Sequence, residues 1–211
     1  MERVRAICLI AGVFFFALAF ALMGVLPILS LHDLPVAKLE EIAPAPPPPS
    51  WDDLARRWPE AFKREIGEPT VENWHRAIRR GRDVYVGEAC WHCHSQFVRP
   101  VSNESLRFGP VSTAAEYQNE MQMPVLFGTR RVGPDLTREG GKRPNDWHAA
   151  HFWNPPDVVP VSVMPRYPWF FSAAAEGQAP ALNRDGFSIL AYVQWLGTWP
   201  RTAVEGEGSS P

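Results

Sequence analysis

Apolar residues form one long uninterrupted run at the start of the chain and shorter periodic patterns further along. From Ala6 to Leu31 there is no Asp, Glu, Lys or Arg in 26 residues. As a helix this run would measure ~39 Å, which exceeds the ~30 Å hydrocarbon core of a membrane. It therefore predicts a transmembrane helix. A signal peptide has an apolar core of only about 7–15 residues, so cleavage near Ala19 or Ala21 is the less favoured alternative.

Three later segments repeat apolar residues at helical spacing. The first, Trp51 to Glu68, predicts an amphipathic helix that is broken or begins at Pro59. The second, from Val71, predicts a helix that runs towards residue 90, and the third, Gly186 to Gly197, predicts a last helix. Their apolar positions are Leu54, Trp58, Phe62 and Ile66; Val71, Trp74, Ile78, Val84 and Tyr85; and Phe187, Ile189, Leu190, Val193, Trp195 and Leu196.

Charges on the two sides of the apolar run predict its orientation. Arg3 and Arg5 precede it, whereas Asp33, Glu40 and Glu41 follow it. Positively charged residues favour the cytoplasmic side, so the N-terminus is expected in the cytoplasm. In a bacterium the chain would cross the inner membrane once and place its remaining residues in the periplasm.

Composition and proline content suggest four regions. The 211 residues carry a formal net charge of -2, so no nucleic-acid partner is expected, and 22 prolines indicate loop-rich packing. The tract from Ala43 to Ser50 predicts a stiff polyproline II spacer. We expect an anchor at residues 1–33, a proline-rich linker and amphipathic insert at 34–70, a folded domain at 71–200 and a disordered polar tail at 201–211.

The chemistry of the chain is concentrated in Cys90-Trp91-His92-Cys93-His94, a C-x-x-C-H motif. Two thiols at this spacing can form thioether bonds to one haem, and the next imidazole becomes an axial ligand of the iron. A zinc clip or a disulfide is the alternative, but zinc would need a second ligand pair. The third cysteine, Cys8, lies in the apolar run, where it is expected to act as a small hydrophobic residue. The motif thus predicts one covalently bound haem c, one-electron transfer and a domain outside the cytoplasm, whose first and last helices pack together.

The second axial ligand is not decided by local sequence. Met164 follows His94 by 70 residues, precedes Pro165 and is favoured by this spacing, since the chain can then wrap round the haem. His148 and His151 are further candidates, or else they are satisfied surface or propionate-contacting histidines. The methionines after the motif are Met121, Met123 and Met164.

Three blocks of sequence resemble one known family. The first is GEACWHCHSQFVRP at residues 87–100, the second GTRRVGPDLTREGG at 128–141, and the third DWHAAHFWNPPDVVPVSVMPRYPWFF at 146–171. In this order they are similar to the monohaem cytochrome c subunit (subunit II, the "O" subunit) of cbb3-type cytochrome c oxidases. The fold expected from this resemblance is mainly α, with a single N-terminal transmembrane helix followed by a class I-like monohaem cytochrome c domain with long proline-rich loops.

The resemblance also implies a site and a role. Cys90 and Cys93 would hold the haem, and His94 and Met164 would ligate its iron. In that family the subunit is not itself the catalyst. It passes electrons to the haem-copper catalytic subunit, which reduces oxygen to water. A dihaem cytochrome c subunit usually supplies the electrons, and a soluble cytochrome c is another possible donor.

Further residues are expected around the haem. The carbonyl of Pro134, in Gly133-Pro134, would accept the Nδ1–H of His94 and fix its ring. Arg131, with Arg99 and Arg130, is a candidate to neutralise haem propionates or to meet acidic groups on a partner, or these arginines are solvated charges.

Other features differ from the family or leave alternatives open. The proline tract, the insert from Trp51 to Val71 and the length of Asn103 to Met123 depart from its pattern, so they put the docking geometry and the electron donor in doubt. Tyr167 and Trp169 would cover the haem edge or belong to the core. The rival functions are the cytochrome c subunit of a nitric oxide reductase, whose motif lacks the following Ser-Gln and Arg-Pro, a free-standing anchored electron shuttle, and an enzyme with an open haem face.

Overall fold

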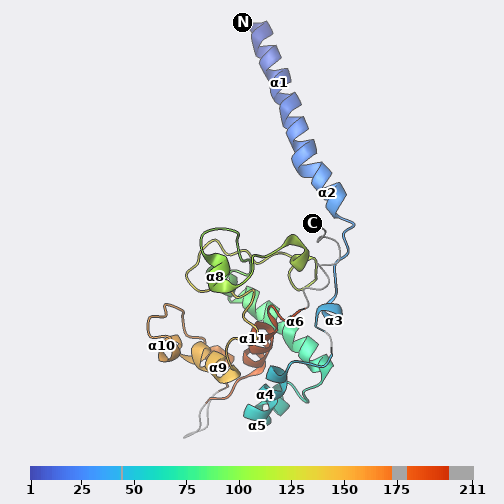
Figure 1. Ribbon diagram of the computed structural model, residues 1–211. Coiled ribbons are helices and arrows are strands. Elements are labelled where there is room, and N and C mark those ends of the chain that lie inside the picture. Colours follow the sequence, from blue (N-terminus) through green and yellow to red (C-terminus); the bar gives the residue numbers. More distant parts are fainter. Residues whose placement is uncertain (44, 173–179, 200–211) are drawn as a thin grey trace. The chain divides into compact units, whose positions relative to one another are not determined.

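The computed structural model describes residues 1–43, 45–172 and 180–199 (Figure 1). The chain divides into two compact units, Met1–Val36 and Ala37–Pro211. The predicted disordered tail at 201–211 lies outside the described residues.

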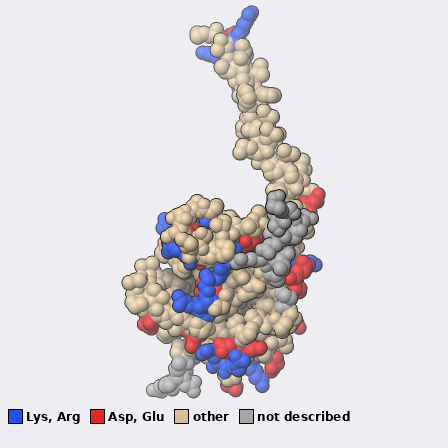
Figure 2. All heavy atoms as spheres, in the orientation of Figure 1, with Lys and Arg blue, Asp and Glu red and all other residues tan. Residues whose placement is uncertain are grey.

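The N-terminal unit is a single helical rod. Helix α1 (Glu2–Phe20) continues through a π-helical turn (Ala21–Val25) into α2 (Leu26–Leu31). Over Glu2–Leu31 the mean hydropathy reaches 2.7, and none of that stretch is buried. Figure 2 shows basic and acidic side chains at its N-terminal end, where the sequence has Glu2, Arg3 and Arg5, and an uncharged surface along the rest of the helix. The predicted N-terminal helix is confirmed, and it is long and apolar enough to cross a membrane.

The C-terminal unit is built from helices and loops. It contains no β-sheet within the described residues, where only two isolated bridges join Ala37 to Asn119 and Phe171 to Leu182. The predicted mainly α fold is therefore confirmed. Its elements are α3 (Leu39–Ile42), α4 (Pro49–Arg57), α5 (Pro59–Glu65), α6 (Val71–Gly87), α7 (Cys90–Cys93), α8 (Glu104–Phe108), α9 (Asn145–Trp153), α10 (Pro155–Val158) and α11 (Arg184–Trp195), with 3₁₀ turns at Ala114–Tyr117 and Pro168–Phe170.

Helices α6 and α11 pack against each other at the centre of this unit (Figure 1). Gly81 of α6 permits the close approach, because a Cβ there would lie 2.0 Å from the carbonyl oxygen of Ser188 in α11. The rings of Tyr85 and Tyr192 meet across the same interface with centroids 5.5 Å apart. All residues from Gly186 to Trp195 are buried, so α11 forms the core of the unit.

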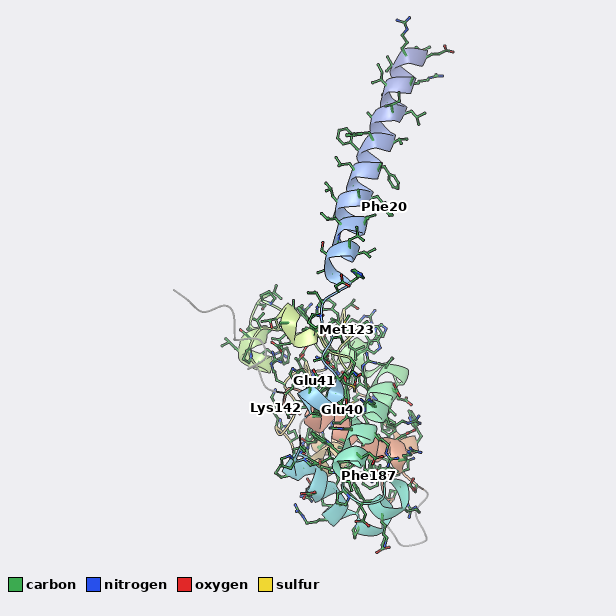
Figure 3. The ribbon with its side chains drawn as sticks, turned by 90° about the vertical axis from the view of Figure 1, so that its right-hand side faces the viewer. Phe20, Glu40, Glu41, Met123, Lys142 and Phe187 are labelled. Carbon is green, nitrogen blue, oxygen red and sulfur yellow. The ribbon has the colours of Figure 1, made fainter. Side chains whose placement is uncertain are left out.

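The amphipathic segment before α6 packs on this core as two short helices. Trp51 of α4 and Phe62 of α5 are almost fully buried. Their rings lie 5.0 Å apart, and Phe62 lies 5.3 Å from Phe187 of α11, which Figure 3 labels. The proline tract, expected to be a spacer through Ser50, instead ends in α4, whose first residue is Pro49. Proline is favoured at this position because the first helical N–H has no partner to lose.

Candidate functional site

The C-x-x-C-H motif lies directly after α6, where the chain turns sharply. Ala89, which lies between the end of α6 and the start of α7, adopts a left-handed conformation with φ of 56°, and the chain changes direction there. The one-turn helix α7 then holds Cys90 and Cys93, which stand three residues apart and so share one helix face. Both thiols are free, and burial raises the pKa of Cys90 to about 12. The motif thus presents two thiols and the His94 imidazole on a short, fixed segment.

The His94 ring is oriented from a distant loop. Its Nδ1 lies 2.9 Å from the carbonyl oxygen of Pro134, which is the predicted hydrogen bond. The neighbouring Gly133 donates its N–H to the carbonyl of Cys93 over 3.1 Å. A Cβ on Gly133 would lie 2.2 Å from Cε1 of His94, so only glycine fits there. Because Nδ1 is engaged and burial lowers the pKa of His94, the neutral ring keeps Nε2 as the nitrogen available for a metal.

Two aromatic residues follow Met164 and surround the motif. Tyr167 is buried, and its burial together with the nearby Cys90 raises the pKa of its hydroxyl. Trp169 is 53% exposed and donates its Nε1–H to Glu88 Oε1 over 3.0 Å. Tyr167 therefore belongs to the core at the motif, whereas Trp169 presents its ring at the surface beside it.

The three candidate methionines occupy different environments. Met121 is buried among core side chains, and Met123 is 46% exposed (labelled in Figure 3). Arg82 holds this loop through hydrogen bonds to both of their carbonyl oxygens, at 2.7 and 3.0 Å. Met164 is half-buried and packs on the core, and its N–H donates to Ser162 Oγ over 3.2 Å. Of the three, only Met164 is neither enclosed by protein nor displayed on the surface.

Arg131 belongs to a charge network that the sequence did not predict. Glu104 accepts hydrogen bonds from both Arg99 and Arg131, and these bonds lower its pKa to about 2. Arg131 also pairs with Asp135 at 3.1 Å and donates to the carbonyl of Phe97 over 2.8 Å. Two carboxylates therefore balance the two guanidinium groups. Asp135, in the G-P-D-L run, was the one available signal of this network.

The residues that follow the motif join it to neighbouring segments. Ser95 and Gln96 are fully buried. The carbonyl of Ser95 accepts the N–H of Leu136 at 3.0 Å, and the N–H of Gln96 donates to Leu126 at 2.9 Å. The Gln96 side chain accepts the hydroxyl of Tyr192 at 3.0 Å. These contacts tie the motif to two loops and to the core helix α11.

Helix α9 carries His148 and His151, the two histidines that the sequence names as further candidates. His148 is 5% exposed and its Nε2 has no hydrogen-bond partner, nor does the buried Nδ1 of His151. The pKa of each is lowered to about 4, mainly by burial. The His94 ring also contributes to the lowered pKa of His151.

The residues present fit a haem. Two thiols lie on one helical turn, an imidazole is held by its Nδ1 with Nε2 free, and a glycine leaves room at its ring. In the described ranges, no three His, Cys, Asp or Glu side chains gather closely enough to bind a metal ion, which is what the zinc alternative would require.

Comparison with known proteins gives one family. Residues 67–183, more than half of the chain, match the family described as "Cytochrome C oxidase, mono-heme subunit/FixO". No curated protein matches the chain. The matched residues include α6, the C-x-x-C-H motif, the loop of Gly133-Pro134 and α9. This confirms the resemblance found in the three sequence blocks: the chain belongs to the family of mono-heme subunits of cytochrome c oxidase.

Proposed function

We propose that this chain is a membrane-anchored cytochrome c that transfers electrons to the haem-copper catalytic subunit of a cbb3-type oxidase, which reduces oxygen to water in aerobic respiration. One observation carries the proposal. The imidazole that follows the two cysteines is fixed by the Pro134 carbonyl at 2.9 Å, so that its Nε2 is free for iron. Within a family of oxidase mono-heme subunits, this arrangement suits a resident electron carrier.

The chain's own residues hold the cofactor in this proposal. Cys90 and Cys93 would hold one haem c through thioether bonds, and His94 and Met164 would ligate its iron. A haem bound in this way supplies reversible one-electron chemistry at its iron. The half-buried environment of Met164 supports its assignment over Met121 and Met123.

A second group of residues, Pro134 and Arg131, positions the segments that hold the haem. Pro134 fixes the tautomer and orientation of the His94 ring. Arg131 joins the segment of Phe97 to the loop of Gly133-Pro134, because it contacts the Phe97 carbonyl and Asp135 together. A direct contact of Arg131 with a haem propionate stays a prediction.

The N-terminal helix anchors the chain in the bacterial inner membrane. Arg3 and Arg5 keep the N-terminus in the cytoplasm, and the haem-binding unit lies in the periplasm. Single-pass anchoring keeps the subunit beside its partner. The chain does not catalyse oxygen reduction by itself.

The partners follow from the same proposal. The acceptor is the catalytic subunit, and the donor is a dihaem cytochrome c subunit or a soluble cytochrome c. Exposed apolar side chains lie on the segment that carries Met164, with Val161 88%, Val163 76% and Trp169 53% exposed. Apolar groups displayed in this way are typical of surfaces that contact another protein.

Purification from native membranes in mild detergent tests the proposal. A band of covalent haem c at 23.7 kDa that travels with a polytopic, b-haem and copper-containing, oxygen-consuming subunit is expected. Cys90→Ala should lose a thioether bond and alter the pyridine haemochrome spectrum. Cys8→Ala, in the apolar helix, is the matched control and should leave that spectrum unchanged.

Other outcomes of the purification would contradict the proposal. A partner with b haem and non-haem iron but no copper would indicate the cytochrome c subunit of a nitric oxide reductase. Haem c without any membrane partner would indicate a free-standing electron shuttle. Carbon monoxide binding by the reduced subunit would indicate an open haem face and an enzyme in its own right.

A further inference from the structure

Asp135 is a buried carboxylate next to Pro134, the residue whose carbonyl accepts the hydrogen bond from His94. The residue as a whole is 1% exposed, and its side chain is 0% exposed. A carboxylate removed from water needs hydrogen bonds and an opposite charge in place of the water. The partners of Asp135 therefore indicate which segments its side chain holds together.

Both oxygens of this carboxylate have partners. Oδ1 accepts the N–H of Thr137 over 2.8 Å, and Oδ2 accepts the N–H of Phe97 over 3.0 Å. Oδ2 also lies 3.1 Å from Nη1 of Arg131. Through Thr137 the carboxylate shapes its own loop, and through Phe97 it ties that loop to the segment that follows the C-x-x-C-H motif.

The contact of Pro134 with His94 lies between two backbone hydrogen bonds. Each joins the loop at 133–136 to the segment at 93–95: Gly133 donates to the Cys93 carbonyl over 3.1 Å, and Leu136 donates to the Ser95 carbonyl over 3.0 Å. The Pro134 carbonyl oxygen lies 2.9 Å from Nδ1 of His94. The backbone bonds persist in any side-chain variant, whereas the Asp135 carboxylate is a tie that a substitution can remove.

Arg131 has further partners that do not involve Asp135. It donates to Glu104 Oε2 over 2.7 Å and to the carbonyl of Phe97 over 2.8 Å. These bonds keep the guanidinium in place when Asp135 is replaced. The effect of a substitution at Asp135 would therefore fall on the loop that carries Pro134.

We propose that Asp135 is a positioning residue for the iron ligand: its carboxylate holds the Pro134 carbonyl against Nδ1 of His94 and thereby lowers the reduction potential of the bound haem. A firmly held acceptor at Nδ1 makes the imidazole a stronger electron donor at Nε2, which stabilises ferric iron. The negative charge of the carboxylate acts in the same direction. The inference rests on the proposed function, because it needs His94 to ligate the haem iron.

The test follows the Nδ1–H of His94 by NMR in the reduced holoprotein, together with equilibrium redox titration. Asp135→Ala removes both acceptor oxygens. We expect the Nδ1–H to exchange with solvent about tenfold faster and the reduction potential to shift upwards. Asp135→Asn keeps the shape of the side chain and one acceptor oxygen, so its exchange rate should lie between those of the wild type and Asp135→Ala.

Two controls separate positioning from a general loss of stability. The backbone amide of Tyr192, in the buried helix α11, is the internal reference, and its exchange rate should not change. Asp185→Asn is the matched variant, because it removes a carboxylate that pairs with Arg80 at 2.8 Å and so joins α11 to α6 instead. It should leave the potential and the Nδ1–H exchange of His94 at their wild-type values.

The outcomes distinguish this inference from the proposed function. Equal rises in potential in Asp135→Ala and Asp135→Asn with unchanged Nδ1–H exchange would overturn the inference, because the charge alone would then act. Faster exchange shared by the Tyr192 amide would also overturn it, since Asp135 would then be merely structural. If Asp135→Ala does not fold, Asp135→Asn against the wild type decides in the same way. A wild-type protein without covalent haem would instead overturn the proposed function.

Discussion

Gly133 lies against the His94 ring so closely that a Cβ would stand 2.2 Å from Cε1 and 2.6 Å from Nδ1 of the imidazole. The same loop supplies the Pro134 carbonyl that accepts the Nδ1–H. The backbone of Gly133 thus fixes the plane of the His94 ring, and the carbonyl of Pro134 fixes its tautomer.

Gly133→Ala should displace the His94 ring and weaken its coordination to iron. The ring cannot move away without losing the hydrogen bond to Pro134, so both orientation and ligation suffer. Absorption spectra of the purified holoprotein should show a loss of low-spin haem. Gly87→Ala is the control, because a Cβ there meets nothing within 4 Å. A Gly133→Ala spectrum identical to that of Gly87→Ala would contradict the role given to Gly133.

Gly81→Ala should destabilise the packing of α6 on α11. The new methyl group would meet the Ser188 carbonyl oxygen at 2.0 Å and the Tyr192 Cβ at 2.5 Å, both of which are fixed in the core helix. Overpacking of this kind costs about 1–3 kcal/mol or more of unfolding free energy. Denaturant titration would measure the loss. Here too Gly87→Ala serves as the control, and equal stabilities of the two variants would show that the helices can separate at little cost.

Glu104→Gln should destabilise the C-terminal unit by ~3 kcal/mol, because Arg99 and Arg131 then lose their shared carboxylate. The wild type should show a matching dependence on pH. The folded pKa of Glu104 is about 2 against a reference value of 4.5. Its stabilising contribution is therefore complete above pH 4.5 and is lost as the pH falls towards 2.

Denaturant titrations of the wild type and Glu104→Gln across that range check the prediction. The difference in unfolding free energy should shrink as the pH falls from 4.5 to 2. Glu60→Gln, at an exposed position in α5, should track the wild type throughout. A difference that stays constant down to pH 2 would show that the carboxylate charge is not what Glu104 contributes.

Met164→His should retain the haem and lower its reduction potential, because imidazole stabilises ferric iron better than a thioether does. Potentiometric titration would measure the change. Met123→His places the same side chain at an exposed site in another loop and should leave the potential unchanged. A change in the reduction potential of Met123→His with no change in Met164→His would assign the sixth iron ligand to the loop that carries Met123.

Trp51→Ala should lower the unfolding free energy of the C-terminal unit by about 3–5 kcal/mol. The Trp51 ring packs on Phe62, which contacts Phe187 of the core helix, so the segment before α6 is part of the folded unit. Thermal and denaturant unfolding would measure the loss, with the 88% exposed Val161→Ala as control. Equal stabilities of the two variants would mean that α4 and α5 are only loosely attached.

The local parts of the site were predictable from the sequence, and the long-range parts were not. The C-x-x-C-H spacing, the helices at Val71 and Gly186 and the contact of Pro134 with His94 follow from short motifs or from the family resemblance. The pairing of Arg131 with Glu104 does not, because it joins residues 27 apart that no periodicity relates. Nor does the burial of His148 in α9, since it depends on how this helix packs against α4 and α11.

Transient oxidation of this subunit's haem in the intact oxidase would show whether the chain passes electrons to the catalytic subunit. The complex purified from native membranes would be reduced fully, mixed rapidly with oxygen, and followed at the haem c absorption bands. We expect that the haem c of this chain is oxidised during the first turnovers of the complex and stays reduced in the isolated subunit. A haem c that remains reduced while the complex consumes oxygen would contradict the assignment of this chain as the electron donor to the catalytic subunit.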